Sequence, residues 1–125
     1  MPDRRILVVD DDHDVSKVLA EILLAAGYSA EHVETAEAAR AKLIEGGFIG
    51  AVIDCVMPRH RADDLMALAQ NSGVAVVLMS GDERAIAALK ECGLRYLQKP
   101  FRMRELLQSV EAALSENQAL RRAHR

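Results

Sequence analysis

The chain has 125 residues, of which 50% are hydrophobic and 28% charged, and its formal net charge at pH 7 is −3. This length supports one domain with its own core, and the negative charge argues against a surface that directly binds nucleic acid. Two cysteines, no signal-peptide pattern and no apolar run near the roughly 20 residues that span a bilayer predict a cytoplasmic domain with no membrane partner.

The first predicted strand ends on three adjacent carboxylates. Ile6 to Val9 is an unbroken apolar run, typical of a strand covered on both faces, and Asp10, Asp11 and Asp12 follow it directly. Carboxylates this close repel by roughly 4 kcal/mol per pair at about 4 Å and an effective dielectric constant near 20, so a site that keeps two together usually contains a cation. The alternative is a solvated turn in which Asp11 or Asp12 caps the next helix. This stretch alone leaves both interpretations open.

Helices and strands alternate along the rest of the chain. Apolar residues spaced three and four apart predict helices, Thr35 is suited to cap the second of them, and residues 55–61 form a basic loop. The strand after the first helix has mixed polarity, which favours an edge of the sheet. We predict helices over about 15–26, 36–43, 63–70, 83–91 and 103–114, and further strands over 29–33, 49–53, 74–79 and 96–98. This alternation predicts an α/β fold with a parallel sheet and right-handed crossovers.

Four of the five predicted strands end on a residue with useful chemistry. Besides Asp10 or Asp11, these residues are Asp54, Ser80 and Lys99. The carboxyl ends of parallel strands meet at one edge of a sheet, so we expect the four to converge. Oxygen-rich surroundings select a hard cation such as Mg²⁺.

The same edge has the groups needed to hold a phosphoryl group. Lys99 offers a positive charge, Ser80 a hydroxyl, and Gly81 a backbone N–H that a ligand can approach closely. The sequence has no Gly-rich nucleotide loop, so the phosphoryl group is not expected to arrive as a bound nucleotide. A carboxylate at the centre of such a cradle can accept it as an acyl phosphate.

The chain resembles the response-regulator receiver domains of two-component signalling, up to about Leu114. The resemblance is carried by Val-Val-Asp-Asp at 8–11, Asp54 followed by Met57-Pro58, Ser80-Gly81, and Lys99-Pro100-Phe101. It implies a flavodoxin-like receiver fold, a doubly wound (βα)5 unit whose five-stranded parallel sheet has the order 2-1-3-4-5. It also implies a receiver domain over 1–118, with 119–125 as a basic tail or the start of a linker.

The resemblance also implies a role for each site residue. The phosphoacceptor is Asp54, and the switch residues are Ser80 and Tyr96. The phosphoryl group is stabilised by Lys99, Ser80 and Gly81, and the Lys99–Pro100 bond is cis. Mg²⁺ (or Mn²⁺) is held by Asp11 directly, by Asp10 through water, by Asp54 and by the backbone carbonyl of Val56.

The implied function is that of a phosphorelay component and not of a metabolic enzyme. A sensor histidine kinase or a histidine phosphotransfer protein would supply the phosphoryl group. The face made by the fourth helix, last strand and last helix would signal to a downstream protein or a second copy. Two other classes stay open: a Mg²⁺-dependent phosphohydrolase, and an interaction module that does not need phosphorylation.

Other interpretations concern single residues. Ser80 with Glu83 fits a capping box for the fourth helix, and Asp12 fits a helix cap. Cys55 is expected to be a small packing residue and Cys92 a core residue. The four histidines, His13, His32, His60 and His124, have no partners at ligand spacing and are predicted to face solvent.

The loop after the acceptor departs from the family pattern. Receiver domains commonly have a glycine a few residues after the Met-Pro pair, and residues 59–64 contain none. Val56 is apolar where many relatives have a polar side chain that orients water, which predicts slow loss of an acyl phosphate. The basic run Arg59-His60-Arg61 is suited to partner recognition or, more simply, is a solvated surface.

Overall fold

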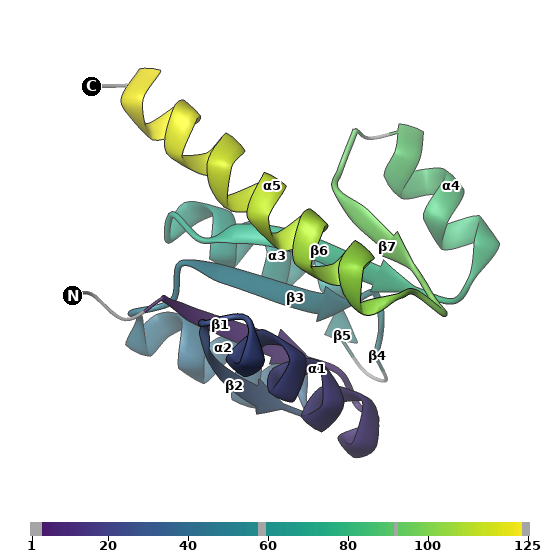
Figure 1. Cartoon of the computed structure of the whole chain (residues 1–125). Coiled ribbons are helices and arrows are strands. Elements are labelled where there is room, and N and C mark those ends of the chain that lie inside the picture. The colour runs from purple at the N-terminus through teal and green to yellow at the C-terminus, as the bar shows by residue number, and fades with distance from the viewer. Residues whose placement is uncertain (1–3, 58–59, 92, 124–125) are drawn as a thin grey trace.

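The computed structural model describes residues 4–57, 60–91 and 93–123, without the side chains of 56–63 and 121 (Figure 1). Its main sheet has five parallel strands in the order β2-β1-β3-β6-β7. Counted along the chain, this order is 2-1-3-4-5, which confirms the predicted fold. The strands are β1 (Arg5–Val9), β2 (Ser29–Val33), β3 (Gly50–Asp54), β6 (Ala75–Ser80) and β7 (Tyr96–Gln98).

Five helices cover the two faces of this sheet. Figure 1 shows α1 and α5 on the near face, and α5 extends beyond the sheet towards its C-terminal end. Side chains of α2, α3 and α4 pack in the core on the other face. The helices are α1 (His13–Ala25), α2 (Ala36–Glu45), α3 (Ala62–Asn71), α4 (Glu83–Glu91) and α5 (Met103–Ala123).

Four strands, β1, β2, β3 and β6, contribute to two separate cores, because successive side chains point to opposite faces. Ile6 and Val8 of β1 pack with residues of α1 and α5, whereas Leu7 and Val9 pack with residues of α2 and α3. All four are 0% exposed. The unbroken apolar run therefore does form a strand buried on both faces, and β2, with its mixed polarity, lies at an edge.

Polar side chains fix the starts of three helices. Asp12 caps α1, accepting hydrogen bonds from the backbone N–H groups of Asp14 (3.0 Å) and Val15 (3.2 Å). Thr35 Oγ1 accepts one from the N–H of Ala38 (3.1 Å) at the start of α2. At α4, Asp82 Oδ1 accepts one from the N–H of Arg84 (2.9 Å).

The predicted capping box at Ser80 and Glu83 is wrong. The helix begins at Glu83, so its cap is Asp82, and Ser80 is still the last residue of β6. The Ser80 hydroxyl instead accepts a hydrogen bond from the N–H of Asp82 at 3.0 Å.

Two further segments differ from the sequence prediction. Within the predicted basic loop, β4 (Val56–Met57) pairs antiparallel with β5 (His60–Arg61), and Pro58 and Arg59 between them lie outside the described residues. The final helix continues to Ala123, past the apolar stripe that ends at Leu114. Within the described part of the chain, no helix has both the length and the apolar character needed to cross a membrane.

Candidate functional site

An acidic pocket, formed by Asp10, Asp11 and Asp54, lies at the carboxyl end of the central strands. β1 and β3 are parallel neighbours with Val9 opposite Ile53, so the residues that follow these two meet. One carboxylate oxygen from each of the three aspartates lies within 4.8 Å of the others. Asp10 is 1% and Asp54 6% exposed, whereas Asp11 is open to solvent. The expected convergence of the strand ends is therefore present.

Lys99 joins the two buried carboxylates. Its Nζ donates a hydrogen bond to Asp10 Oδ2 at 2.7 Å and to Asp54 Oδ2 at 3.2 Å. The backbone N–H of Lys99 donates to the carbonyl of Ser80 at 2.8 Å, which holds the lysine beside the end of β6. Burial opposes the charged form, but the Asp10 hydrogen bond and the Asp54 charge outweigh it and raise the pKa of Lys99 above its usual value.

The described side chains of the acidic pocket have more negative than positive charge. Among them, three carboxylates face one ammonium group, which gives a formal charge of −2. Asp10 is held in place from a second side, because its Oδ1 accepts a hydrogen bond from the N–H of Asp12 at 2.9 Å. Clustered carboxylate oxygens fit Mg²⁺, which takes oxygen ligands and keeps several waters. Asp10, Asp11 and Asp54 are therefore a suitable donor set for this ion.

The other predicted site residues lie at the end of β6 and on β7. Ser80 is completely buried at the end of β6, and Gly81 next to it is exposed. A Cβ added at Gly81 would lie 3.8 Å from Cβ of Lys99, an ordinary contact, so the lysine does not require glycine there. Tyr96 is half-buried on β7, opposite Leu78 of β6. The Lys99–Pro100 peptide bond is cis.

Some predictions fall on parts of the chain that are not described. β4 begins at Val56, but the side chain of Val56 lies outside the described residues, as do Cys92 and the side chains of His60 and His124. Cys55 is partly buried and packs against the core on the α2 and α3 face, as predicted.

The prediction that His13 and His32 have no partners at ligand spacing is wrong. His13 is exposed as predicted, but its Nδ1 contacts the carboxylate of Glu34, and its ring lies edge-on to that of His32, which is half-buried. Linear spacing cannot show this group, because it forms only when β2 lies beside β1. Sheet topology is the signal that predicts it: both strands end at the same edge, where α1 begins.

An apolar groove of about 560 Å³ adjoins the acidic pocket, with Lys99 in its wall. One side is α1 and the other is the segment from β7 to the start of α5. Val18 and Met103, one on each side, are 51% and 60% exposed. The groove is lined by Asp14, Val15, Val18, Leu19, Ile22, Lys99, Pro100, Phe101 and Met103.

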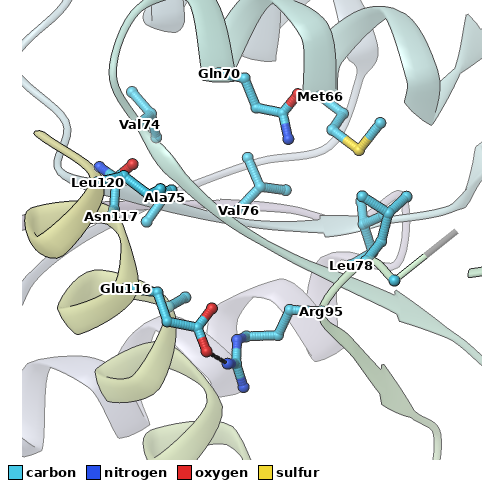
Figure 2. Close-up of a pocket in the computed structure, with 13 residues that line it drawn as sticks. Met66, Gln70, Val74, Ala75, Val76, Leu78, Arg95, Glu116, Asn117 and Leu120 are labelled. Carbon is cyan, nitrogen blue, oxygen red and sulfur yellow. Dashed lines mark hydrogen bonds and ion pairs between the residues drawn. The ribbon is translucent and has the colours of Figure 1, made fainter. Parts of the chain in front are cut away.

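A separate cavity of about 270 Å³ lies at the amino end of β6 and β7, beside the C-terminal half of α5 (Figure 2). Arg95 forms an ion pair there with Glu116, and Asn117 donates a hydrogen bond to the carbonyl of Gly73 at 3.0 Å. Among the described residues, Nε of Arg95 is buried without a hydrogen-bond partner. We refer to it as the Arg95 cavity.

The family model of the response regulator receiver domain matches residues 6–111. The chain belongs to this family. Its similarity to CpdR of Brucella abortus, a response regulator receiver protein, is 30% identity over 89% of this chain and 97% of CpdR.

Other curated relatives are longer. VanRB of Enterococcus faecalis, a regulatory protein, is 30% identical over 97% of this chain and 57% of its own length. NtrX of Azorhizobium caulinodans, a nitrogen assimilation regulatory protein, is 35% identical over 94% of this chain and 27% of its own length. The chain thus spans about half of the first relative and a quarter of the second.

Solved receiver structures share this architecture. A CheY-like receiver domain of Methanospirillum hungatei aligns with a TM-score of 0.81 and 26% identity over 94% of this chain and 98% of its own. The response regulator TrrA of Thermotoga maritima, solved in complex with Mg²⁺ and BeF, aligns with a TM-score of 0.78 and 25% identity over 88% of this chain and 98% of its own. The protein is thus a response-regulator receiver domain of two-component signal transduction.

Proposed function

We propose that this receiver domain takes a phosphoryl group onto Asp54 and passes the signal on through a change of shape. The observation that carries the proposal is the contact of one ammonium group, on Lys99, with two buried carboxylates, Asp10 and Asp54. The clustered carboxylates are suited to bind a divalent ion first. The ammonium group of Lys99 is suited to bind a phosphoryl group second.

Asp10, Asp11, Asp54 and the backbone carbonyl of Val56 would hold Mg²⁺ or Mn²⁺. When bound, this ion supplies positive charge that offsets the charge on the transferring phosphoryl oxygens. Asp11 is the exposed member of the set, and Asp10 is fixed by Lys99 and by the N–H of Asp12.

Asp54 is the nucleophile in the proposed step. One of its carboxylate oxygens forms a bond to phosphorus while the bond from phosphorus to the donor's histidine nitrogen breaks, and that bonding pair stays with the imidazole. Lys99 Nζ, already 3.2 Å from Asp54 Oδ2, stabilises the phosphoryl oxygens. The Ser80 hydroxyl and the N–H of Gly81 supply hydrogen bonds from the neighbouring strand end.

The acyl phosphate would then change the packing at β6 and β7. Ser80 would leave the N–H of Asp82 and turn its hydroxyl to the new dianion. Tyr96 is half-buried, and we expect it to move inward as Ser80 moves. The face of α4, β7 and α5 would thereby present a different surface to a downstream protein or a second copy.

The donor is proposed to be a protein, either a sensor histidine kinase or a histidine phosphotransfer protein. The apolar groove beside the acidic pocket supports this assignment, because its exposed Val18 and Met103 offer a docking surface next to Lys99. A Val18→Asp variant should lose transfer from such a protein but keep transfer from a small phosphodonor.

The direct test is incubation with Mg²⁺ and acetyl phosphate, followed by mass spectrometry of the intact protein and its peptides. We expect one phosphoryl group, on Asp54, that hydroxylamine removes. Asp54→Asn should take up none. Asp64→Asn, which changes an exposed aspartate on α3, should behave like the wild type.

Other outcomes would contradict the proposal. Modification at another residue would exclude Asp54 as acceptor. Repeated release of phosphate from small phosphoesters would favour a phosphohydrolase. Partner binding that is indifferent to Asp54→Asn would favour an interaction module that does not need phosphorylation.

A further inference from the structure

A second group of possible metal ligands lies one strand away from the acidic pocket. It consists of His13, the first residue of α1, His32 on β2, and Glu34 just after β2. One ligand atom from each lies within 4.8 Å of the other two. None of the three belongs to the phosphoryl-transfer site described above.

The sheet brings these residues together. β1 and β2 are parallel with Val8 opposite His32, and the N–H of Asp10 donates to the carbonyl of Val33 at 3.2 Å. Glu34 therefore leaves the sheet where β1 also ends, close to the first turn of α1. Backbone pairing therefore brings the three residues to one edge of the sheet, where the exposed side chains of His13 and Glu34 complete the group.

The spacing of the two imidazole rings fits a shared metal ion. A zinc ion lies about 2.0–2.1 Å from a bound imidazole nitrogen, so two rings on one tetrahedral ion have centres roughly 5.1–5.3 Å apart. The ring centres of His13 and His32 are 5.6 Å apart, with the planes inclined by 65°. Only small rotations of the exposed His13 and Glu34 side chains are needed to complete a ligand set.

A buried serine contacts one ring nitrogen of His32. Ser16 is 0% exposed, and its hydroxyl donates to the carbonyl of His13 at 3.0 Å. The same hydroxyl lies 3.3 Å from Nδ1 of His32. This contact occupies Nδ1, which leaves Nε2 as the ring nitrogen that a metal can approach. Metal-bound histidines commonly have their other ring nitrogen held in this way.

The ligand types select a different class of ion from the acidic pocket. Imidazole nitrogens suit Zn²⁺, Ni²⁺, Cu²⁺ and related ions, whereas carboxylate clusters suit Mg²⁺. The neighbouring exposed carboxylates Asp11, Asp12 and Asp14 make the region attractive to any cation. An ion pair between His13 and Glu34 alone would explain two of the three positions, but not the approach of His32, which also has a ligand atom within 4.8 Å of both.

We propose that His13, His32 and Glu34 form a binding site for a divalent transition metal such as Zn²⁺. Nδ1 of His13, Nε2 of His32 and the Glu34 carboxylate bind the ion, and water takes the fourth position. The metal joins the start of α1 to the end of β2, and so stabilises the segment that carries Asp10 to Asp12. The proposal does not depend on phosphoryl transfer to Asp54.

The test is a calorimetric titration of the full chain with Zn²⁺ in excess Mg²⁺, which keeps the acidic pocket occupied. We expect one ion to bind. His13→Gln, His32→Asn and Glu34→Gln should each weaken binding by at least about tenfold. Matched controls are Glu21→Gln, which removes an exposed carboxylate of α1, and His124→Gln, which removes another histidine; both should bind like the wild type.

Histidine ring spectra by ¹H–¹⁵N NMR identify the ligand atoms directly. On adding Zn²⁺, the resonances of Nδ1 of His13 and Nε2 of His32 should shift. Unchanged affinity in Glu34→Gln and His13→Gln, both at exposed positions, would overturn the proposal. So would ring shifts confined to His60 and His124, or loss of binding only when Cys55 or Cys92 is replaced.

Discussion

The short strand β7 has a basic residue at each end, and the two have different surroundings. Arg95 precedes it and pairs with Glu116, whose side chain is 66% exposed, in the Arg95 cavity (Figure 2). Lys99 follows it and meets the carboxylates of Asp10 and Asp54, whose side chains are 1% and 8% exposed. Among the described residues, the Arg95 end pairs one charge of each sign, and the Lys99 end has three carboxylates for one ammonium group.

This difference supports the proposal that charge balance, more than cavity size, marks the functional end of the sheet. Neighbouring carboxylates repel one another, and folded proteins keep such clusters mainly where a ligand or a reaction uses them. In the Arg95 cavity one carboxylate faces one guanidinium group. The described side chains of the acidic pocket have a formal charge of −2, which one divalent cation would offset.

Lys99→Ala against Arg95→Ala gives the largest expected contrast. Removing Lys99 takes away the only cation among the described residues of the acidic pocket. Phosphorylation by acetyl phosphate in Mg²⁺ should slow by about 10²–10³-fold, the usual effect of losing one donor to a developing charge. Arg95→Ala should leave the rate unchanged. Stopped-flow or quenched assays of acyl phosphate formation measure both, and equal rates in the two variants would remove the distinction between the two ends.

Mg²⁺ should stabilise the folded protein, an effect expected to be large but smaller than the loss of phosphorylation rate in Lys99→Ala. A ligand present at 100 times its dissociation constant stabilises the folded state by about 2.7 kcal/mol. Thermal melting of the wild type should shift upward accordingly as Mg²⁺ is added. Asp11→Asn should lose most of this shift, whereas Glu116→Gln in the Arg95 cavity should keep it. If the melting temperature of Asp11→Asn rose with Mg²⁺ as much as that of the wild type, the ion would bind elsewhere.

A third charged cluster, centred on Glu31, lies at the surface and can be compared with the two ends of β7. Glu31 accepts from Arg5 and Lys42, and its side chain is 39% exposed. The Arg5 hydrogen bond, opposed by burial and helped by Lys42, lowers the pKa of Glu31 below its usual value of 4.5. The interaction therefore stabilises the fold above about pH 4.5 and is lost as the pH falls through the lowered folded-state pKa.

Glu31→Gln should have the smallest effect of the series. At neutral pH it should lower the free energy of unfolding by about 0.5 kcal/mol, because solvent screens an exposed ion pair. The difference from the wild type should vanish in acid and shrink in high salt. Urea denaturation at several pH values measures it, and a difference that grows on acidification would contradict the assigned pKa direction.

The fold and the acidic pocket could be predicted from the sequence because they rest on strand ends. Val9 and Ile53 each precede a carboxylate, and a parallel sheet must place such residues at one edge. Contacts between side chains of different strands could not be predicted in this way. The approach of His13 to Glu34 depends on which strand lies beside β1, and no local pattern in the sequence shows it.

Predictions from local sequence patterns were wrong where the tertiary structure decides where a helix or strand begins and ends. Ser80 and Glu83 have the spacing of a capping box, but the buried end of β6 holds Ser80 in the strand, and Asp82 takes the cap. Residues 55–61 look like a loop because they are basic and contain a proline, yet the chain reverses within them and Val56 pairs with Arg61. Turn geometry decides such pairing, and composition does not reveal it.

The most direct test of the central claim is the free energy of unfolding of the wild type and Asp54→Asn, with EDTA and with Mg²⁺. If the mutual repulsion of the three neighbouring carboxylates is kept for function, Asp54→Asn should be more stable than the wild type in EDTA, by about 1 kcal/mol or more. Mg²⁺ should then narrow or reverse that difference. A wild type that is already the more stable protein in EDTA, and does not respond to Mg²⁺, would contradict the account.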